Sequence, residues 1–332
     1  MTTIDIQPQS QFFSNNYWRK LRQVQICKKD EEESITETVM GKVKCDINQQ
    51  FQHLKSVISA KYCKQRDILA TTSIDKIVRI FSMDGSLKHQ FENSSDYDKT
   101  LSFSYNGQFL ACAGAYDKMI RIWNIDSQEL QFQLKGLKSR ILKVTYFNNR
   151  DDRLISITQD NQIQIWDIKS QTIIQSLTGQ QSLITSIQIS NDDFRCVTGS
   201  VDGMIIEWDL KNYKLKNQWK GHQKGCFALK YANGGHTLVS GGADKKIKLW
   251  NMDKYKLFKQ FNGHSSPIYA IEVKKDTVIS CQFNQTLMWN MKSLSIVQQI
   301  SSTQLDYCFV EIMKDSFVIG YNGNGIKVCD FQ

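Results

Sequence analysis

The stretch TLVSGGADKKIKLW, residues 237–250, contains two short apolar segments joined by a turn. Its second half, from Ile247 to Trp250, alternates apolar and polar side chains, which is typical of a β-strand with one buried face. Asp244 and the lysine after it lie between the two halves, and aspartate is a residue that favours tight turns. The stretch therefore predicts a β-hairpin whose second strand ends on a tryptophan.

The same pattern recurs along the chain at intervals of 39–43 residues. The positions that match Trp250 are Phe81, Trp123, Trp166, Trp208, Trp250, Trp289 and Cys329. Five of them follow an aspartate by six residues, and those aspartates are Asp75, Asp117, Asp160, Asp202 and Asp244. Each period has room for four short strands. A fixed period of this length predicts an all-β fold, a seven-bladed β-propeller of four-stranded antiparallel blades.

The composition is that of a folded chain without a membrane anchor. The sequence is 41% hydrophobic and has only two prolines, so a large core and long strands are allowed. No run approaches the ~18 apolar residues of a membrane span. The first residues, MTTIDIQPQSQ, lack the basic and then apolar pattern of a secretory signal. We expect a cytoplasmic protein, with the nucleus as the alternative.

Cysteine usage and charge argue against two further classes of site. The nine cysteines are odd in number and form no Cys-x-x-Cys pair, so we expect reduced, buried thiols and no zinc or other metal site. The formal net charge is +9, but the lysines fall mostly singly in loops and at alternate strand positions. This distribution favours lysines that lie exposed to solvent around the rim of the protein over lysines gathered in a surface that binds nucleic acid.

Together these residues resemble the WD40-repeat (β-transducin-like) propellers over roughly residues 43–332. In that family a buried tetrad joins a histidine after glycine, a Ser or Thr of the second strand, the turn aspartate and the tryptophan. The complete set in the fifth repeat is His222, Ser240, Asp244 and Trp250. The third and fourth repeats lack the histidine, the sixth has Phe283 in place of the aspartate, and the seventh has lost nearly every signature residue.

The two ends of the chain are expected to meet in one blade. The seventh repeat stops after its third strand, at Gln332, and therefore lacks an outer strand. Residues 43–51, in the segment MGKVKCDINQQF, have the right pattern to supply that strand and to remove an open sheet edge. Residues 1–42 then form an N-terminal extension, and residues 43–332 form the propeller.

The sequence predicts no enzyme activity. His222, Ser240 and Asp244 are the residue types of a hydrolase triad, but the resemblance implies a buried hydrogen-bond network that locks a loop. The five turn aspartates belong to separate blades and so do not form an acid/base pair. No glycine-rich phosphate loop occurs. We expect no catalytic residue and no cofactor.

The resemblance also implies where partners bind. In WD40 propellers the narrow face of the ring is lined by the third and fifth residues after the histidine position and by the residue before the turn aspartate. On this basis the expected partner contacts are Lys99, Leu101, Tyr116, Arg140, Leu142, Phe227 and Tyr269. The set is apolar and aromatic with one cationic sector, which suits an interface. For Leu142, packing inside its own blade is the alternative.

These observations favour a non-enzymatic scaffold, a monomeric propeller that binds peptides or protein loops within a larger complex. A first alternative is a substrate receptor of a cullin-type ubiquitin ligase, whose adaptor motif in this family is Trp-Asp-x-Arg. The nearest matches here, at 166–169 and 208–211, have lysine in the place of the arginine. A lysine side chain lacks the planar guanidinium fork of arginine, so the match to the adaptor motif is weak. A second alternative, motivated by the charge of +9, is a nucleic-acid or phosphoinositide binder.

Overall fold

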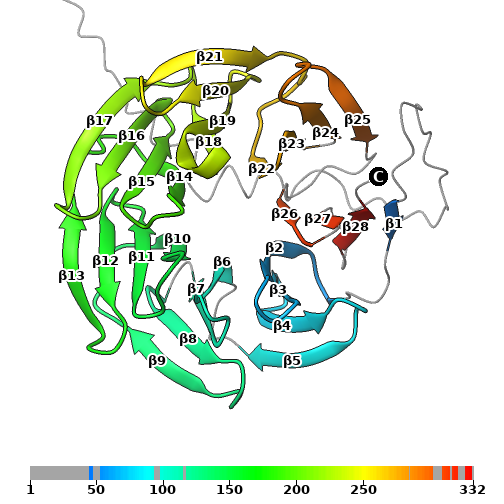
Figure 1. Cartoon of the computed structure of the whole chain (residues 1–332). Coiled ribbons are helices and arrows are strands. Elements are labelled where there is room, and N and C mark those ends of the chain that lie inside the picture. Colours follow the sequence, from blue (N-terminus) through cyan, green and yellow to red (C-terminus); the bar gives the residue numbers. More distant parts are fainter. Residues whose placement is uncertain are drawn as a thin grey trace, which may run out of the picture. The chain divides into compact units, whose positions relative to one another are not determined.

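Each period of the sequence folds into one four-stranded antiparallel sheet, and seven such sheets stand around a common centre (Figure 1). This is the seven-bladed propeller that the repeat predicts. The computed structural model describes residues 45–47, 53–92, 98–114, 117–283, 285–301, 309–314, 316–320 and 326–330. These residues all belong to one unit, Glu37–Gln332. The extension expected at residues 1–42 lies outside the described residues.

The strands of each blade follow one another from the centre of the ring outward. The first blade consists of β2 (Val57–Cys63), β3 (Ile68–Ser73), β4 (Ile77–Ser82) and β5 (Leu87–Glu92). The second consists of β6 (Asp98–Phe103), β7 (Phe109–Gly114), β8 (Ile120–Asn124) and β9 (Leu130–Leu134). The third consists of β10 (Ile141–Tyr146), β11 (Arg153–Thr158), β12 (Ile163–Asp167) and β13 (Thr172–Leu177).

The next three blades have the same order. The fourth blade consists of β14 (Ile184–Ile189), β15 (Arg195–Ser200), β16 (Met204–Asp209) and β17 (Lys214–Lys220). The fifth consists of β18 (Cys226–Ala232), β19 (Thr237–Gly242), β20 (Ile247–Asn251) and β21 (Lys256–Phe261). The sixth consists of β22 (Ala270–Lys274), β23 (Thr277–Gln282), β24 (Gln285–Asn290) and β25 (Ile296–Ser301). A single turn of 3-10 helix, Asn233–Gly235, connects β18 to β19.

The seventh blade combines strands from both ends of the sequence. It contains β26 (Val310–Ile312), β27 (Ser316–Gly320), β28 (Ile326–Asp330) and, at the outer edge, β1 (Cys45–Ile47). Cys45 lies opposite Cys329, and Ile47 lies opposite Lys327, in an antiparallel pair. The described strand falls inside the segment expected in this place, residues 43–51, whose other residues are outside the described ranges.

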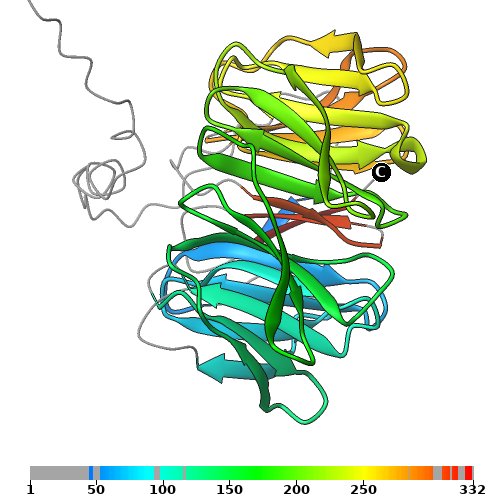
Figure 2. The ribbon, with the colours of Figure 1, turned by 90° about the vertical axis from the view of Figure 1, so that its left-hand side faces the viewer.

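The hydrophobic core is divided among the spaces between neighbouring blades. Figure 2 shows the ring from the side, with neighbouring blades packed against one another. Both faces of the middle strands are covered, so every residue of β3 and of β19 is buried. The outer strands have one uncovered edge, and β13 is largely exposed. Leu134 of the second blade and Tyr146 of the third share one such core. The cysteines with described side chains are buried in the blades as thiols.

The turn aspartates shape the hairpins between the second and third strands. Asp75 accepts a hydrogen bond from the Ile77 backbone N–H at 3.0 Å, and Asp202 accepts one from Met204 at 3.0 Å. Such a bond to the residue two positions on closes an Asx turn. The residue after the aspartate has a positive φ, and at Gly203 a Cβ would meet the His222 carbonyl oxygen. Only glycine fits there.

Candidate interaction site

The tetrad of the fifth blade is a continuous chain of hydrogen bonds. The Trp250 indole N–H donates to the Ser240 hydroxyl at 2.8 Å. Ser240 Oγ lies 2.8 Å from His222 Nε2, and His222 Nδ1 lies 2.7 Å from Asp244 Oδ1. The chain closes when Ser240 donates to Nε2 and the Nδ1–H donates to the carboxylate. It joins two strands of the blade, β19 and β20, and the turn between them to the loop before the blade.

Burial makes this network structural rather than nucleophilic. Ser240 is 0% exposed and His222 is 1% exposed, so no substrate reaches the hydroxyl. Burial lowers the pKa of His222 although the Asp244 carboxylate opposes the shift. Burial alone would raise the pKa of Asp244, but the hydrogen bond from His222 and the Lys248 charge lower it. The neutral imidazole is therefore held between one donor and one acceptor.

The sixth blade has the same network with an amide in place of the carboxylate. His264 Nε2 lies 2.7 Å from Ser280 Oγ, and the Trp289 indole N–H donates to that hydroxyl at 2.8 Å. His264 Nδ1 donates to Gln282 Oε1 at 3.1 Å. The same oxygen also accepts a hydrogen bond from the Ser266 backbone N–H. The sequence pattern places Phe283 at the aspartate position, but the acceptor is Gln282, the last residue of β23, which reaches the histidine from the strand and not from the turn.

Two other blades replace members of the network. In the fourth, Gln180 occupies the histidine position: its amide donates to Ser200 at 2.6 Å, and its carbonyl oxygen accepts from Thr198 at 2.9 Å. In the first, His53 lies 2.6 Å from Thr71 Oγ1, while the Arg79 guanidinium donates to Asp75 at 2.7 Å. Side-chain type varies, but the bond from the loop to the second strand remains.

One of the predicted partner contacts lies in the core. Leu101 is 5% exposed and packs between the first two blades, so it cannot present its side chain to a partner. The β6 ladder has a bulge at Lys99, between Asp98 and Thr100, and is regular at Leu101, which lies opposite Cys112. In β18 the fifth residue after the histidine, Phe227, is the bulge residue, whereas Leu101 lies two residues past the bulge of β6. Lys99, not Leu101, is the structural counterpart of Phe227.

The bulge recurs at the start of the innermost strands. The residues at this position, each omitted from the ladder pairing, are Ile58, Lys99, Leu142, Thr185 and Phe227. A bulge re-aims the extra side chain and leaves it outside the regular register. Phe227 and Leu142 are accordingly half-buried rather than enclosed. In five of the blades the bulge therefore takes one residue of the innermost strand out of the regular register.

Three aromatic rings from two blades gather at this level of the ring. Phe227 stacks on Tyr269 with their centroids 5.4 Å apart and their planes 4° from parallel. Phe283, in the turn after β23, packs against Tyr269 at 4.5 Å. All three side chains are half-buried. We call Phe227, Tyr269 and Phe283 the aromatic cluster. Sequence reasoning had placed the first two on this face separately but not Phe283.

The remaining predicted contacts are more widely distributed. Arg140 and Leu142 lie in the third blade and are half-buried, and Leu142 packs partly against the core shared with the fourth blade. Packing inside the blade, the alternative for Leu142, therefore accounts for part of its surface. Lys99 is described only by its place in β6. Tyr116 lies outside the described residues.

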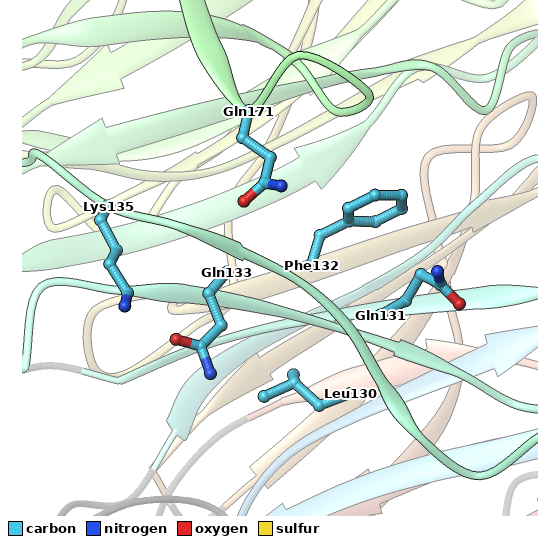
Figure 3. A pocket seen from close by; sticks show the side chains of 6 residues that line it. All are labelled: Leu130, Gln131, Phe132, Gln133, Lys135 and Gln171. Atoms are coloured by element: carbon cyan, nitrogen blue, oxygen red, sulfur yellow. The ribbon is translucent and has the colours of Figure 1, made fainter.

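Hollows in the surface lie away from these residues. A shallow one of about 320 Å³ is formed by the outer strand β9 and the turn before β13, where Leu130, Phe132 and Gln171 surround it (Figure 3). Another, of about 400 Å³, lies beside Arg66 and Asp126, which are paired at 2.5 Å. Within the described ranges no group of three His, Cys, Asp or Glu side chains is placed to hold a metal ion.

The part of the chain covered by the structure contains no helix of the length and apolar character that crossing a membrane requires.

Comparison with known proteins gives two findings. The family model "WD domain, G-beta repeat" matches residues 93–124, 171–209 and 213–251. A "Ribosome biogenesis protein WDR12 homolog" from Anopheles gambiae is 24% identical over 158 residues, which cover 46% of this chain and 36% of the relative. The chain thus matches about a third of the length of that relative. Three matched repeats lie inside the ring of seven four-stranded blades, so the chain contains WD40 repeats and its fold matches that of the WD40-repeat β-propellers.

Proposed function

We propose that the chain is a non-enzymatic interaction scaffold, a monomeric propeller that binds a segment of a protein partner on its narrow face. The aromatic cluster is the observation that carries this proposal. Large, rigid aromatic side chains dominate interface energies because they bury much area and lose few rotors. Phe227, Tyr269 and Phe283 are held by one another, yet each remains half-exposed.

The rest of the face supports a partner segment rather than a small molecule. The bulge places one side chain outside the ladder in each of the third, fourth and fifth blades, so a bound segment that leaves Phe227 meets Thr185 and then Leu142. The two hollows described above, near β9 and beside Arg66, are not lined by the aromatic cluster. An extended peptide or loop fits such a surface better than a compact ligand.

The relative supports a place for the chain in a multiprotein assembly. That relative is named as a ribosome biogenesis protein, and the similarity covers nearly half of this chain. The net charge of +9 is compatible with an assembly that contains RNA. We therefore infer that pre-ribosomal particles are the first assembly to examine. Co-sedimentation of the tagged chain with such particles on a sucrose gradient tests this inference.

The partner site is tested by affinity purification of the tagged chain with two matched variants. Phe227→Ala should weaken partner binding by about 1–3 kcal/mol, or roughly 5- to 150-fold in Kd. Phe258→Ala removes the same side chain from the outer strand β21, where it is 49% exposed, and should leave binding unchanged. Loss of partners from the Phe258 variant alone would move the site to the outer rim and overturn the proposal.

A further inference from the structure

The net positive charge of the chain arises in one sector of the ring. Residues 214–261, from the first residue of β17 to the last residue of β21, contain eleven lysines, no arginine and two aspartates. The formal charge of this segment is therefore +9, which equals the formal net charge of the whole chain. The rest of the sequence has equal numbers of basic and acidic side chains, so its formal charge is zero.

Two neighbouring outer strands, β17 and β21, present part of this charge to solvent (Figure 1). Lys214 and Lys256 occupy the same position in the two strands, opposite Asp209 and Asn251 of the third strands, and both lysines are exposed. The corresponding residue of the third blade is Thr172. The outer strands of the blades on either side, β13 and β25, contain no charged residue, so the basic surface is bounded on both sides.

A buried contact between the fourth and fifth blades brings the lysines of both blades to one seam. The Glu207 carboxylate is fully buried and accepts a hydrogen bond from the Tyr255 hydroxyl at 2.6 Å. The same carboxylate lies 3.5 Å from the Lys216 ammonium of β17. Lys254 and Lys256 flank Tyr255 and are exposed. Lysines that fall singly along the sequence, a distribution that favoured a solvated rim, are thus gathered by the fold.

The acidic side chains next to this seam have other partners. Asp209 accepts hydrogen bonds from two backbone N–H groups of the turn that follows it. Asp253 pairs with His236 at 3.2 Å. Among the described residues, four exposed lysines of the two blades belong to no ion pair: Lys211, Lys214, Lys254 and Lys256. We call these four lysines, together with Lys216, the basic rim.

Apolar side chains lie exposed among the lysines of the basic rim. Leu215 and Leu257 are exposed at equivalent positions of β17 and β21, opposite the tryptophans of the third strands. The Lys211 ammonium lies 3.6 Å from the centroid of the Phe194 ring, which is nearly half exposed. Surfaces that bind single strands of nucleic acid combine these two features, because ammonium groups attract the phosphates while aromatic and apolar faces receive the unpaired bases.

We propose that the basic rim binds single-stranded nucleic acid, with its lysines on the phosphates and with Phe194 and the exposed leucines against the bases. Every nucleotide carries a phosphate, so one strand can contact the lysines of both blades without a specific sequence. A duplex keeps its base faces stacked inside and would leave the apolar part of this surface uncovered. The site is separate from the aromatic cluster, so its failure would leave the proposed partner site on the narrow face unaffected.

Fluorescence anisotropy of the full chain with a labelled oligouridine tests the site. Binding should weaken as salt rises, because each phosphate contact of a single strand contributes a slope of about −0.7 in log K against log salt. The double variant Lys214→Glu with Lys256→Glu should lose about 10-fold or more in affinity and should flatten the slope by about 1.4, since two contacts are removed. Lys214→Arg with Lys256→Arg keeps both charges and should bind like wild type. Both positions are exposed, so all of these variants should keep the wild-type Tm.

A matched pair of substitutions separates a local site from an effect of net charge. Lys64→Glu with Lys88→Glu changes the net charge by the same amount at exposed positions of the first blade and should leave binding unchanged. If the wild-type chain does not bind oligouridine at low salt, or if this control weakens binding as much as the Lys214 and Lys256 pair, the proposal is wrong. Tighter binding of a duplex of the same length would overturn it in favour of double-stranded nucleic acid. Displacement of oligouridine by polyglutamate at equal charge concentration would overturn it in favour of an acidic protein segment.

Discussion

The fifth and seventh blades have the same four-stranded topology but different interiors. In the fifth, Ser240 and Trp250 belong to a buried hydrogen-bond chain. In the seventh, Ile319 and Cys329 occupy the corresponding positions and pack against Phe317 in an apolar core. A blade therefore forms without the tetrad. Apolar packing is enough for the sheet, and the network has a narrower role: it fixes the loop that enters the blade.

The largest effect is expected from removing the strand that completes the seventh blade. Deleting residues 1–52 takes away β1 and leaves the outer edge of β28 unpaired, so we expect aggregation or loss of the cooperative transition. Deleting residues 1–38 leaves β1 in the chain and should preserve Tm. Circular dichroism and size-exclusion chromatography compare the two products. A stable, soluble product of the longer deletion would show that the ring does not need this strand.

The second effect is acid sensitivity, which the histidine-containing blades confer. Burial lowers the pKa of His264 to about 4, from 6.5, so the unfolded chain binds the proton first. The resulting stability is complete above pH 6.5 and is lost as pH falls toward 4, by on the order of 3 kcal/mol. Denaturant unfolding at several pH values measures the loss.

The variant His264→Gln supplies the control for this pH dependence. Glutamine does not titrate, and Gln180 already fills the histidine position of the fourth blade. The variant should therefore have a flatter stability profile between pH 6.5 and 4 than the wild-type chain. Equal slopes in the two proteins would mean that His264 is not responsible for the acid sensitivity.

The third effect concerns the network of the fifth blade. Asp244→Ala leaves the His222 Nδ1–H without its acceptor and should destabilise the fold by about 1–3 kcal/mol. Asp253→Ala, at a carboxylate that is 60% exposed beside His236, should change stability by no more than about 0.5 kcal/mol. Native-state hydrogen exchange should place the Asp244 effect in the fifth blade. An unchanged Tm in the Asp244 variant would show that the network does not stabilise the fold.

The sequence predicted the fold well because it repeats one local pattern. The turn aspartates and the alternation before each tryptophan gave the blade number and the tetrad of Ser240 and Asp244. The surface was harder, because it depends on single-residue shifts. The counterpart of Phe227 in β6 is Lys99, two residues before the assigned Leu101, and the acceptor in the sixth blade is Gln282, one residue before Phe283. Such shifts alter no hydrophobic period and so leave little trace in the sequence.

The pairing of β1 with β28 also determines how the ring would respond to a pulling force. The two strands are antiparallel, and Cys45 faces Cys329 at the end from which both chain termini leave. Tension between the termini therefore loads one ladder pair at a time, as in opening a zipper, and not the whole strand pair in shear. The ring would open at low force at this seam while the six other blades remained folded. A binding partner that clamps both termini would strengthen the molecule mechanically without touching its core.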